Sequence, residues 1–498
     1  MPLLTAMAVA FVLCAAIEVR AGDAQGRSSR RPADLAIRLG AYALILLFWF
    51  VFSWRPWLAA LSCVLTVAVL HLVSRLKRAV IGEPLVFSDF ALLPQVPRHP
   101  QLYYVPPLTS PRVAGPMLLG IAAVALWYRT EPSLLPAVPS ERLAAILAVP
   151  FCLFVVVLAA GRRPLSSWIA RRFPRPDLEA DIARVGLPAC LMAHALRWRF
   201  ERAGAGPATS DAPAMPPGDD LVVVIQLESF VDPERLGGPR LPLMDLIHRR
   251  AAQYGRLRVP AHGAYTMRTE HAVLTGRSPD TLGFGVFDPY LAAGGREPES
   301  LARRARRNGY ETVFVHPFHR DFFRRGEVMA ALGFEGLVME EDFAGAPRVG
   351  PYVGDVAFGA RVLAEVGARR RPLFLFGVTM ENHGPWEPGR LPGLDDPLAQ
   401  YLHHVGGTGR MVEDLVARLG PETATLCVFG DHAPALPTCR PGFGGTATEY
   451  AIFRFGRAAS AVPLRTDLTA DGLGRLLRTT VAADSAAAAT ASVAVPPS

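Results

Sequence analysis

The sequence predicts an N-terminal helical membrane domain with several spans, followed by an α/β domain whose central, largely parallel sheet is flanked by helices. Two observations support this fold class. The 498-residue chain is 51% hydrophobic, yet its long apolar runs are concentrated in the first third. From residue 221 onwards, short apolar runs alternate with amphipathic stretches, which is the pattern of buried strands and covering helices.

Five apolar runs predict membrane spans, and with their flanks they approach the roughly 20 residues that a helix needs to cross a bilayer. The runs lie at 1–17, 39–54, 57–74, 114–128 and 143–160. The first run could be a signal peptide. No basic residue precedes its apolar core and no small-residue cleavage site is evident, so an uncleaved span is favoured. Residues 1–162 are therefore predicted to form a transmembrane domain of about five helices.

Residues 163–217 are predicted to be a juxtamembrane segment and a linker. Tryptophan, leucine and arginine recur there at near-helical spacing, which favours an amphipathic helix on the lipid surface. A helix packed on the soluble domain is an equal alternative. The Pro/Ala/Gly-rich residues 203–220 indicate the linker, and residues 218–457 form the predicted α/β domain. Residues 458–498 are expected to be an extension with a disordered end, since no charged or aromatic residue follows Asp484.

The formal net charge of +8 comes almost entirely from arginine, because Lys77 is the only lysine. These arginines are scattered and many flank the predicted spans, so anionic lipid headgroups are favoured as partners over nucleic acid. The six cysteines contain no CxxC pair. Neither a zinc knuckle nor a disulfide framework is indicated.

The α/β domain is predicted from its alternating runs. Strands are expected at 221–228, 312–317, 372–380, 424–431 and 449–455, and helices at 242–253, 298–308, 355–369 and 410–419. In parallel sheets the ligand site lies at the carboxyl ends of the strands. Polar residues stand at or just beyond these ends: Glu228, His316, Glu381, Asn382, His383, Asp431 and His432. One acidic residue at a strand end is usually a helix cap. Polar residues at several strand ends on one edge of the sheet instead predict a ligand-binding site.

The residue types at these ends favour a metal centre. Glu228, Asp431 and His432 form a mixed oxygen and nitrogen set that suits Mn²⁺, Zn²⁺ or Mg²⁺. Thr266 lies where a glycine-containing loop runs into a helix, and a hydroxyl bound to a divalent cation becomes a competent nucleophile. The helix start would add positive potential for an anionic ester. The alternative is a threonine that only caps this helix.

Three further residues are predicted to bind the non-bridging oxygens of an anionic ester. Arg325 offers a planar fork of donors, and His383 and His316 are expected to act as donors, with a histidine also able to protonate a leaving alkoxide. Arg268, Thr269 and Glu270, which follow Thr266, are expected only to position the loop and the helix start.

The ordered motifs "QLESF", "YTMRTEHAVLTG", "FVHPFHRDFFRRGEVMAALGF", "TMENHGPW" and "FGDH" resemble the lipoteichoic acid synthase branch of the sulfatase-like, alkaline-phosphatase superfamily. The resemblance covers roughly residues 220–455. Residues 75–96, "RLKRAVIGEPLVFSDFALLPQV", also resemble the membrane-to-loop segment of that family. Members carry several transmembrane helices before an extracytoplasmic catalytic domain.

The resemblance implies roles for individual residues. The metal ligands fall on Glu228, Thr266, Asp431 and His432, with Thr266 as nucleophile; the substrate-phosphate residues fall on His383, Arg325 and His316. His319 lies close enough in sequence to compete with His316 for its role. Where members have a tryptophan before the arginine, this chain has Phe323-Arg324, which puts glycerol-phosphate contacts of that tryptophan in doubt. No C/S-x-P-x-R motif surrounds Thr266, which argues against sulfate-ester hydrolysis.

The resemblance also implies a function. We expect a membrane-anchored phosphotransferase with one divalent cation, Mn²⁺ before Zn²⁺ or Mg²⁺. It would move a phosphoglycerol-type group from a phospholipid headgroup, such as that of phosphatidylglycerol, to an envelope glycan or glycolipid through a phospho-threonine intermediate. The alternatives are a phosphodiesterase or sulfatase-like hydrolase of the same superfamily, and a non-catalytic membrane protein that binds envelope polymers.

The expected location is the cytoplasmic (inner) membrane, with several spans and an extracytoplasmic catalytic domain. Arginines cluster at 20–38, 75–78 and 162–175, and with five spans these segments share a face with the catalytic domain. An excess of lysine and arginine in short loops favours the cytoplasmic side of a membrane, and this rule alone would place that face in the cytoplasm. Because long domains translocate largely regardless of charge, we follow the family resemblance.

Overall fold

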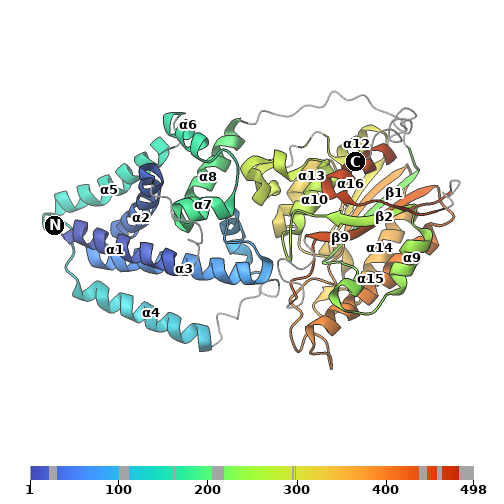
Figure 1. The fold of residues 1–498 in the computed structure, drawn as a ribbon, viewed down its shortest axis with the longest axis horizontal. Helices are drawn as coiled ribbons and strands as arrows, with labels where there is room; N and C mark the ends of the chain where they lie inside the picture. The colour runs from blue at the N-terminus through green and yellow to red at the C-terminus, as the bar shows by residue number, and fades with distance from the viewer. Residues whose placement is uncertain are drawn as a thin grey trace. The chain divides into compact units, whose positions relative to one another are not determined.

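The structure, a computed structural model, describes residues 2–21, 31–99, 102, 111–160, 163–204, 218–293, 297, 299–436, 446–456 and 462–481. The chain divides into two compact units (Figure 1). The first contains Met1–Ala79 and Glu83–Gly204, and the second contains Val80–Gly82 and Ala205–Ser498.

Long apolar helices form most of the first unit: α1 (Pro2–Arg20), α2 (Pro32–Ser53), α3 (Pro56–Ile81), α4 (Pro111–Thr130) and α5 (Pro139–Ala160). Within the described residues, α1, α2 and α3 are long and apolar enough to cross a membrane. Helices α4 and α5 cover the two remaining predicted spans, and their passage through a bilayer stays a prediction. Small buried residues such as Ala10, Ala59 and Cys63 line the packing of α1, α2 and α3, which lets helix backbones approach closely.

The predicted juxtamembrane segment also belongs to the first unit. It forms α6 (Arg163–Arg172), α7 (Leu178–Val185) and α8 (Leu187–Gly204), and a 3-10 helix, η1 (Phe87–Gln95), follows α3. The buried Asp34 of α2 forms ion pairs with Arg184 at 2.9 Å and with Arg172 at 3.4 Å. This segment therefore packs on the apolar helices; its contact with the lipid surface stays a prediction.

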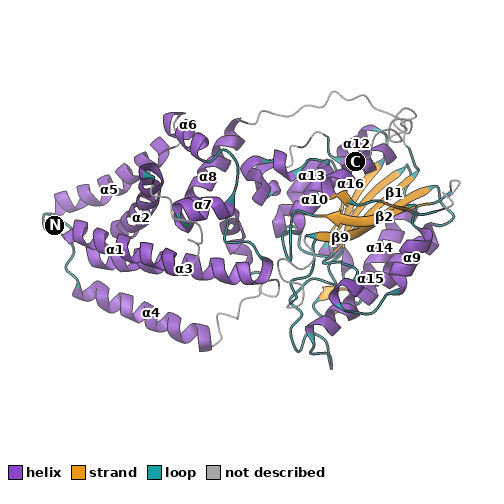
Figure 2. Ribbon diagram, viewed as in Figure 1, coloured by secondary structure: helices purple, strands orange, loops and turns teal. Residues whose placement is uncertain are grey.

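A mixed, mostly parallel sheet forms the centre of the second unit (Figure 2). Its order is β10-β2-β9-β8-β1-β7-β3-β4, with β11 also paired to β2. The strands are β1 (Leu221–Leu227), β2 (Gln253–Arg258), β3 (Glu311–Val315), β4 (Gly336–Val338), β7 (Leu373–Val378), β8 (Ala424–Gly430), β9 (Ala447–Arg454), β10 (Leu464–Arg465) and β11 (Leu468–Thr469). Strands β8, β1, β7, β3 and β4 run parallel, and β9 is antiparallel to both β8 and β2. A separate small hairpin pairs β5 (Arg348–Val349) with β6 (Tyr352–Val353).

The central strands form from continuous apolar runs. Every residue of β1, β7 and β8 is buried, as expected for parallel strands that are covered on both faces. All five strands expected from the sequence are present. The sequence missed β2, whose residues alternate between buried and exposed, and it extended the preceding helix into that strand.

Helices cover both faces of the sheet (Figure 1). On one face, α9 (Pro242–Arg250), α14 (Asp355–Ala368) and α15 (Pro397–Leu419) share an apolar core with β1, β7 and β8. On the other face lie α10 (Thr266–Thr275), α12 (Leu301–Arg307), α13 (Arg325–Leu332) and α16 (Ala470–Thr480). The sequence predicted only the second half of α15. The helix begins earlier, at Pro397, where the Asp396 side chain accepts the Ala399 N–H at 2.8 Å and so caps it.

The remaining helical turns are short: α11 (Pro289–Ala293), η3 (Pro233–Leu236), η4 (Pro279–Thr281), η5 (Gly283–Phe287), η6 (Phe322–Arg324) and η7 (Glu340–Phe343). Beyond residue 461, the predicted C-terminal extension is part of the second unit, because β10 and β11 join the sheet and α16 packs on α10. The predicted disordered end, from residue 482, lies outside the described residues.

Candidate active site

The sheet order brings the predicted strand-end residues to one edge. Strands β8, β1, β7 and β3 are neighbours and parallel, so their carboxyl ends point the same way. Asp431 follows β8, Glu228 follows β1, and His316 follows β3. His383 lies on the loop after β7. This edge is the place where ligands bind in sheets of this kind.

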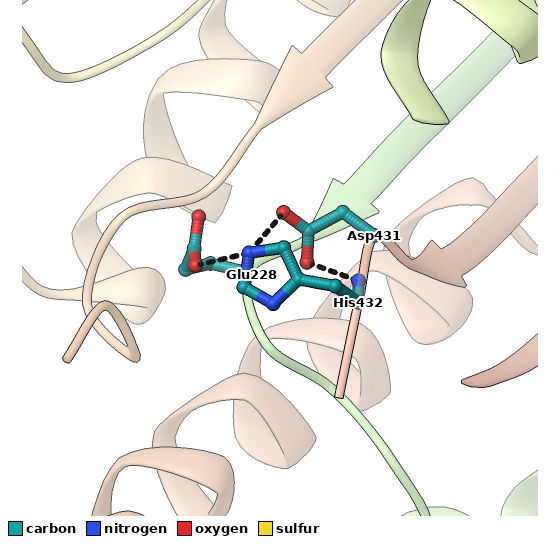
Figure 3. Close-up of side chains that lie close together, drawn as sticks. All are labelled: Glu228, Asp431 and His432. Atoms are coloured by element: carbon teal, nitrogen blue, oxygen red, sulfur yellow. Dashed lines mark hydrogen bonds and ion pairs between the residues drawn. The ribbon is translucent and has the colours of Figure 1, made fainter. Parts of the chain in front are cut away.

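Glu228, Asp431 and His432 form a compact buried group (Figure 3). One ligand atom from each lies within 4.8 Å of the others. The Nε2 atom of His432 is 3.3 Å from Asp431 Oδ2 and 3.5 Å from Glu228 Oε1. His432 Nδ1 lies 3.1 Å from the Ala433 carbonyl oxygen. Because a carbonyl can only accept, Nδ1 carries the proton and Nε2 presents a lone pair, as a metal-binding histidine requires.

The two carboxylates are incomplete without a cation. Asp431 Oδ1 accepts the N–H groups of Ser229 and His432, both at 2.8 Å, whereas the buried Oδ2 receives no hydrogen bond. Burial, and then the charge of Asp431, raise the pKa of Glu228 to about 8. A divalent cation would satisfy the open oxygen and remove the repulsion between the carboxylates. These residues therefore fit a metal site.

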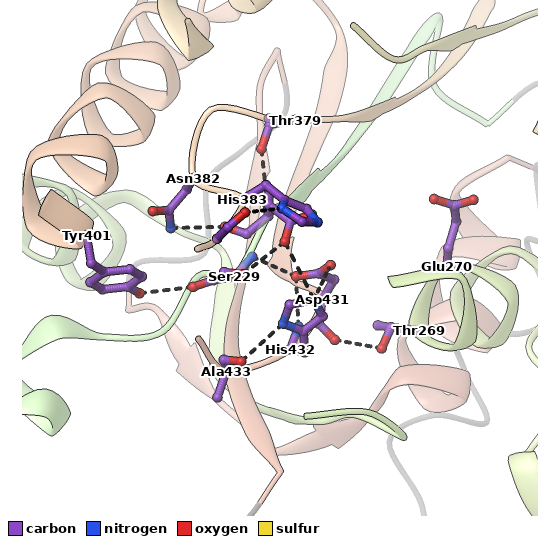
Figure 4. Close-up of polar contacts among 12 residues, drawn as sticks. Ser229, Thr269, Glu270, Thr379, Asn382, His383, Tyr401, Asp431, His432 and Ala433 are labelled. Carbon is purple, nitrogen blue, oxygen red and sulfur yellow. Dashed lines mark hydrogen bonds and ion pairs between the residues drawn. The ribbon is translucent and has the colours of Figure 1, made fainter. Parts of the chain in front are cut away.

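Thr266 is the buried first residue of α10. On one side of it, the Gly263 N–H donates to the Ala433 carbonyl at 3.0 Å. On the other side, the Thr269 hydroxyl donates to the Asp431 carbonyl at 2.6 Å (Figure 4). The chain around Thr266 is thus bonded from both sides to the segment that carries Asp431 and His432.

The backbone adopts unfavourable conformations next to the predicted site residues. In the described part of the second unit, positive φ angles of 51 to 62° occur at four non-glycine residues: Ser229, Tyr265, Phe323 and Arg324. Ser229 follows Glu228, Tyr265 precedes Thr266, and Arg324 precedes Arg325. Each such residue costs about 1–3 kcal/mol, and strain of this kind clusters at functional sites.

Arg325, the first residue of α13, is buried with an unexpected set of partners. Its Nε is 3.3 Å from Glu270 Oε1 and its Nη2 is 3.0 Å from Glu270 Oε2. Its Nη1 is 2.8 Å from His316 Nε2. The Phe323 ring centroid lies 5.5 Å from the Arg325 guanidinium carbon. The Arg325 guanidinium is therefore buried near the group formed by Glu228, Asp431 and His432. Its positive charge partly opposes the rise in the pKa of Glu228.

His316 differs from the donor that the sequence predicted. Its Nδ1 lies 3.1 Å from the Val378 carbonyl, so Nδ1 is protonated and Nε2 accepts from Arg325. Burial, and then the charge of Arg325, lower the pKa of His316 well below its usual value. His316 thus holds Arg325. His319, the nearby alternative, is half exposed and lies 3.1 Å from Glu340.

His383 is half-buried and also presents a lone pair. Its Nδ1 lies 2.6 Å from the Gly384 carbonyl (Figure 4), which leaves Nε2 unprotonated. Burial, and to a smaller extent the charge of Arg390, lower the pKa of His383 to about 4. Arg390 also holds the loop, since its Nη1 donates to the carbonyls of His383 and Pro385 at 2.5 and 2.9 Å. At neutral pH this histidine is therefore uncharged, and its Nε2 can accept a proton.

Comparison with known proteins identifies the family. The sequence profile of the sulfatase family matches residues 220–456. The chain is 32% identical over 468 residues to the capsular polysaccharide biosynthesis protein RkpI of Rhizobium meliloti (strain 1021), an alignment that covers 88% of this chain and 84% of that protein. The chain belongs to the sulfatase family.

Two further proteins are similar to this sulfatase-family chain. One, from the same organism and named for cyclic β-1,2-glucan modification, is 26% identical over 401 residues, which cover 74% of this chain and 62% of that protein. The other is the solved integral membrane protein lipooligosaccharide phosphoethanolamine transferase A of Neisseria meningitidis. It has a TM-score of 0.54 and 12% identity, and the match covers 96% of this chain and 95% of that one. This likeness confirms the predicted fold class, with N-terminal apolar helices before a sulfatase-like sheet domain.

Several residues to which the sequence assigned no role also shape the site of this sulfatase-family protein. Thr379 accepts the Glu228 N–H at 3.0 Å, and the Asn382 side chain donates to the Glu228 carbonyl at 3.1 Å (Figure 4). Both stand just beyond β7; the strand-end pattern included Asn382 and could also have identified Thr379. Glu270 was assigned only to loop positioning, although it lies four residues after Thr266 and hence on the same face of a helix. Tyr290, the other partner of Glu270, carried no sequence signal.

Proposed function

We propose that this protein is a membrane-anchored, metal-dependent phosphotransferase. It moves a phosphoglycerol-type group from a phospholipid headgroup, such as that of phosphatidylglycerol, to a hydroxyl of an envelope glycan or glycolipid. The observation that carries the proposal is the buried Glu228, Asp431 and His432 group beside the start of α10 and the Arg325 guanidinium. The apolar helices α1, α2 and α3 support a lipid donor.

In the first step, the Thr266 oxygen attacks the donor phosphorus. The Thr266 hydroxyl loses its proton, and the bond from phosphorus to the diacylglycerol oxygen breaks. That oxygen takes up one proton, which balances the proton that Thr266 loses, and the phosphoglycerol group remains on Thr266. Bound by Glu228, Asp431 and His432, a divalent cation, Mn²⁺ before Zn²⁺ or Mg²⁺, would lower the pKa of the Thr266 hydroxyl and neutralise developing charge. Arg325 would hold non-bridging oxygens through its remaining N–H groups.

In the second step, a hydroxyl of the acceptor attacks the phospho-threonine. The Nε2 atom of His383 accepts the hydroxyl proton, and the bond from phosphorus to the Thr266 oxygen breaks. The Thr266 oxygen takes up a proton and His383 releases one, which restores the free enzyme. The tautomer of His383 supports this role, because Nδ1 is engaged with Gly384 and Nε2 carries the lone pair.

A glycan is the acceptor that the relatives favour. One relative is named for capsular polysaccharide biosynthesis and the other for cyclic β-1,2-glucan modification. Both names describe work on polysaccharide, which supports a sugar hydroxyl as the group that receives the phosphoglycerol unit.

The test uses the full-length chain in phosphatidylglycerol vesicles with a labelled glycerol headgroup, Mn²⁺ and a cyclic β-glucan. We expect diacylglycerol to be released and the label to move to the glucan. Thr266→Ala is expected to reduce both by about 10³-fold or more, and a chelator is expected to abolish both. Thr275→Ala, at the far end of the same helix, is the matched control and should retain activity.

Two outcomes contradict the proposal. Label that appears only as free glycerol phosphate, with and without glucan, would identify a phosphodiesterase. A Thr266→Ala chain that retains full biological activity would indicate a non-catalytic polymer-binding protein.

A further inference from the structure

We propose that Glu270, supported by Tyr290, is a positioning residue that orients Arg325 toward the substrate phosphate. This inference rests on the proposed function, and it adds a residue pair that holds the anion-binding arginine from behind. Glu270 was expected to serve only the loop and the helix start, whereas the structure buries it against Arg325.

The hydrogen bonds of Arg325 to other side chains leave two of its N–H groups for a ligand. The side chain of Arg325 is 3% exposed and that of Glu270 is fully buried. Of the five N–H groups of a guanidinium, Glu270 receives one from Nε and one from Nη2, and His316 receives one from Nη1. One N–H therefore remains on each of Nη1 and Nη2, and these two can serve phosphate oxygens.

Glu270 is itself held in place. Its Oε1 accepts the hydroxyl of Tyr290, a residue that is buried on α11. The main-chain N–H of Tyr290 donates in turn to Asp288 Oδ1 at 3.0 Å. Burial, and then the charge of Glu270, raise the pKa of Tyr290 well above its usual value. Tyr290 consequently stays protonated and remains a donor. The Glu270 carboxylate is therefore hydrogen-bonded by Tyr290 and by Arg325.

The position of Glu270 on α10 links two parts of the chemistry. Thr266 and Glu270 are four residues apart on one helix, so they share a face. The same rigid element thus carries the proposed nucleophile and the residue that orients the phosphate-binding arginine. Catalysis depends on holding reacting groups within fractions of an ångström, and a shared helix meets this requirement without further contacts.

Orientation and simple charge predict opposite results when Glu270 is neutralised. Glu270→Gln removes a negative charge beside the anion site, so a purely electrostatic effect would strengthen anion binding. If Glu270 acts by orienting Arg325, the loss of the charged fork frees the guanidinium to rotate and weakens anion binding. The sign of the change therefore separates the two explanations.

The test measures binding of sn-glycerol-1-phosphate to the Mn²⁺-loaded full-length chain in detergent micelles by calorimetry. We expect Glu270→Gln to weaken binding about 10- to 100-fold, the loss expected for hydrogen bonds to charged groups. Glu297→Gln is the matched control, because Glu297 is also buried and pairs with a different arginine, Arg277, at 2.8 Å. The control should bind within about twofold of the unaltered chain, and both variants should retain Mn²⁺ affinity.

A double-mutant cycle completes the test. If Glu270 acts through Arg325, Arg325→Ala alone and Arg325→Ala with Glu270→Gln should bind glycerol phosphate equally within about twofold. Equal or tighter binding by Glu270→Gln, additive losses in the cycle, or a parallel loss of Mn²⁺ affinity would each overturn the inference. An unaltered chain that binds glycerol phosphate but transfers nothing from phosphatidylglycerol would defeat the proposed function alone.

Discussion

At the scale of single residues, three histidines of the candidate site share one hydrogen-bond pattern. His316, His383 and His432 each direct Nδ1 at a main-chain carbonyl, of Val378, Gly384 and Ala433 respectively. Each Nε2 consequently presents a lone pair. Their neighbours differ. His316 accepts from the Arg325 guanidinium, and His432 lies by the carboxylates of Glu228 and Asp431. His383 is the proposed proton acceptor in the transfer step.

The pH dependence of the transfer step should report the lowered pKa of His383. An imidazole with an ordinary pKa of about 6.5 would be half protonated at that pH, whereas burial lowers the pKa of His383 to about 4. The neutral, proton-accepting form therefore persists as the pH falls through 6. We expect kcat/KM for the glucan acceptor, measured at saturating Mn²⁺, to lose half its value only near the pKa of His383, at about pH 4.

The His383→Gln variant provides the control, because its residual rate should lack this acid limb. An acid limb centred near pH 6.5 in the unaltered chain would show that His383 is not held neutral in the working enzyme. A rate that increases on acidification would show that the protonated form acts, as a donor.

At the scale of elements, α10 connects the parts of the site. All ten of its residues are buried. Its first turn is bonded to the segment after β8 through Thr269, and its end is held by α16. Arg475 donates to the Gly276 carbonyl at 3.0 Å, and Arg478 donates to the Thr275 carbonyl. Cations at this end satisfy free carbonyls and complement the helix dipole.

Loss of packing between α16 and α10 should therefore destabilise the second unit. Leu477 of α16 is fully buried, and Leu477→Ala is expected to lower the free energy of unfolding by about 2–4 kcal/mol through cavity formation. Leu464→Ala is the matched control, because that leucine is 58% exposed and its truncation should cost less than about 0.5 kcal/mol.

Urea unfolding of the full-length chain in detergent micelles measures both variants. Glycerol phosphate binding by the folded Leu477→Ala chain should also weaken, because α10 carries Thr266 and Glu270. Equal midpoints for the two variants would show that α16 does not support the site.

At the scale of the whole molecule, several basic residues of the first unit form ion pairs. Arg38 lies 3.4 Å from Glu18, Lys77 lies 2.7 Å from Asp89, and Arg78 lies 2.8 Å from Glu179. Arg172 and Arg184 share Asp34. These pairs neutralise part of the positive charge of the first unit. Because the topological bias counts lysine and arginine whether or not an acidic residue pairs with them, the extracytoplasmic orientation stays a prediction.

A reporter fusion after residue 498 should settle the orientation. We expect alkaline phosphatase, which is active only outside the cytoplasm, to be active there, and a fluorescent protein that matures only in the cytoplasm to be dark. A bright fluorescent fusion with an inactive phosphatase fusion would contradict the inner-membrane topology. It would also remove the access to outer-leaflet lipid and glycan on which the proposed transfer depends.

Much of this architecture could be read from the amino-acid order alone. Buried parallel strands are continuous apolar runs, so β1, β3, β7 and β8 were recognisable, and the polar residue at the end of each was visible. Parallel strands bring such ends to one edge. The sequence therefore determined the grouping of Glu228, Asp431 and His432, as well as the apolar helices before them.

Only the tertiary structure decided which side chains hold one another. Glu270 and Arg325 are 55 residues apart, and no periodicity relates them. The role of His316 depended on which of its nitrogens faces a carbonyl, and the packing of α16 on α10 joins segments about 200 residues apart. Hydrogen bonds and ion pairs depend on distance and direction in space, and spacing along the chain specifies these only within a single helix or strand.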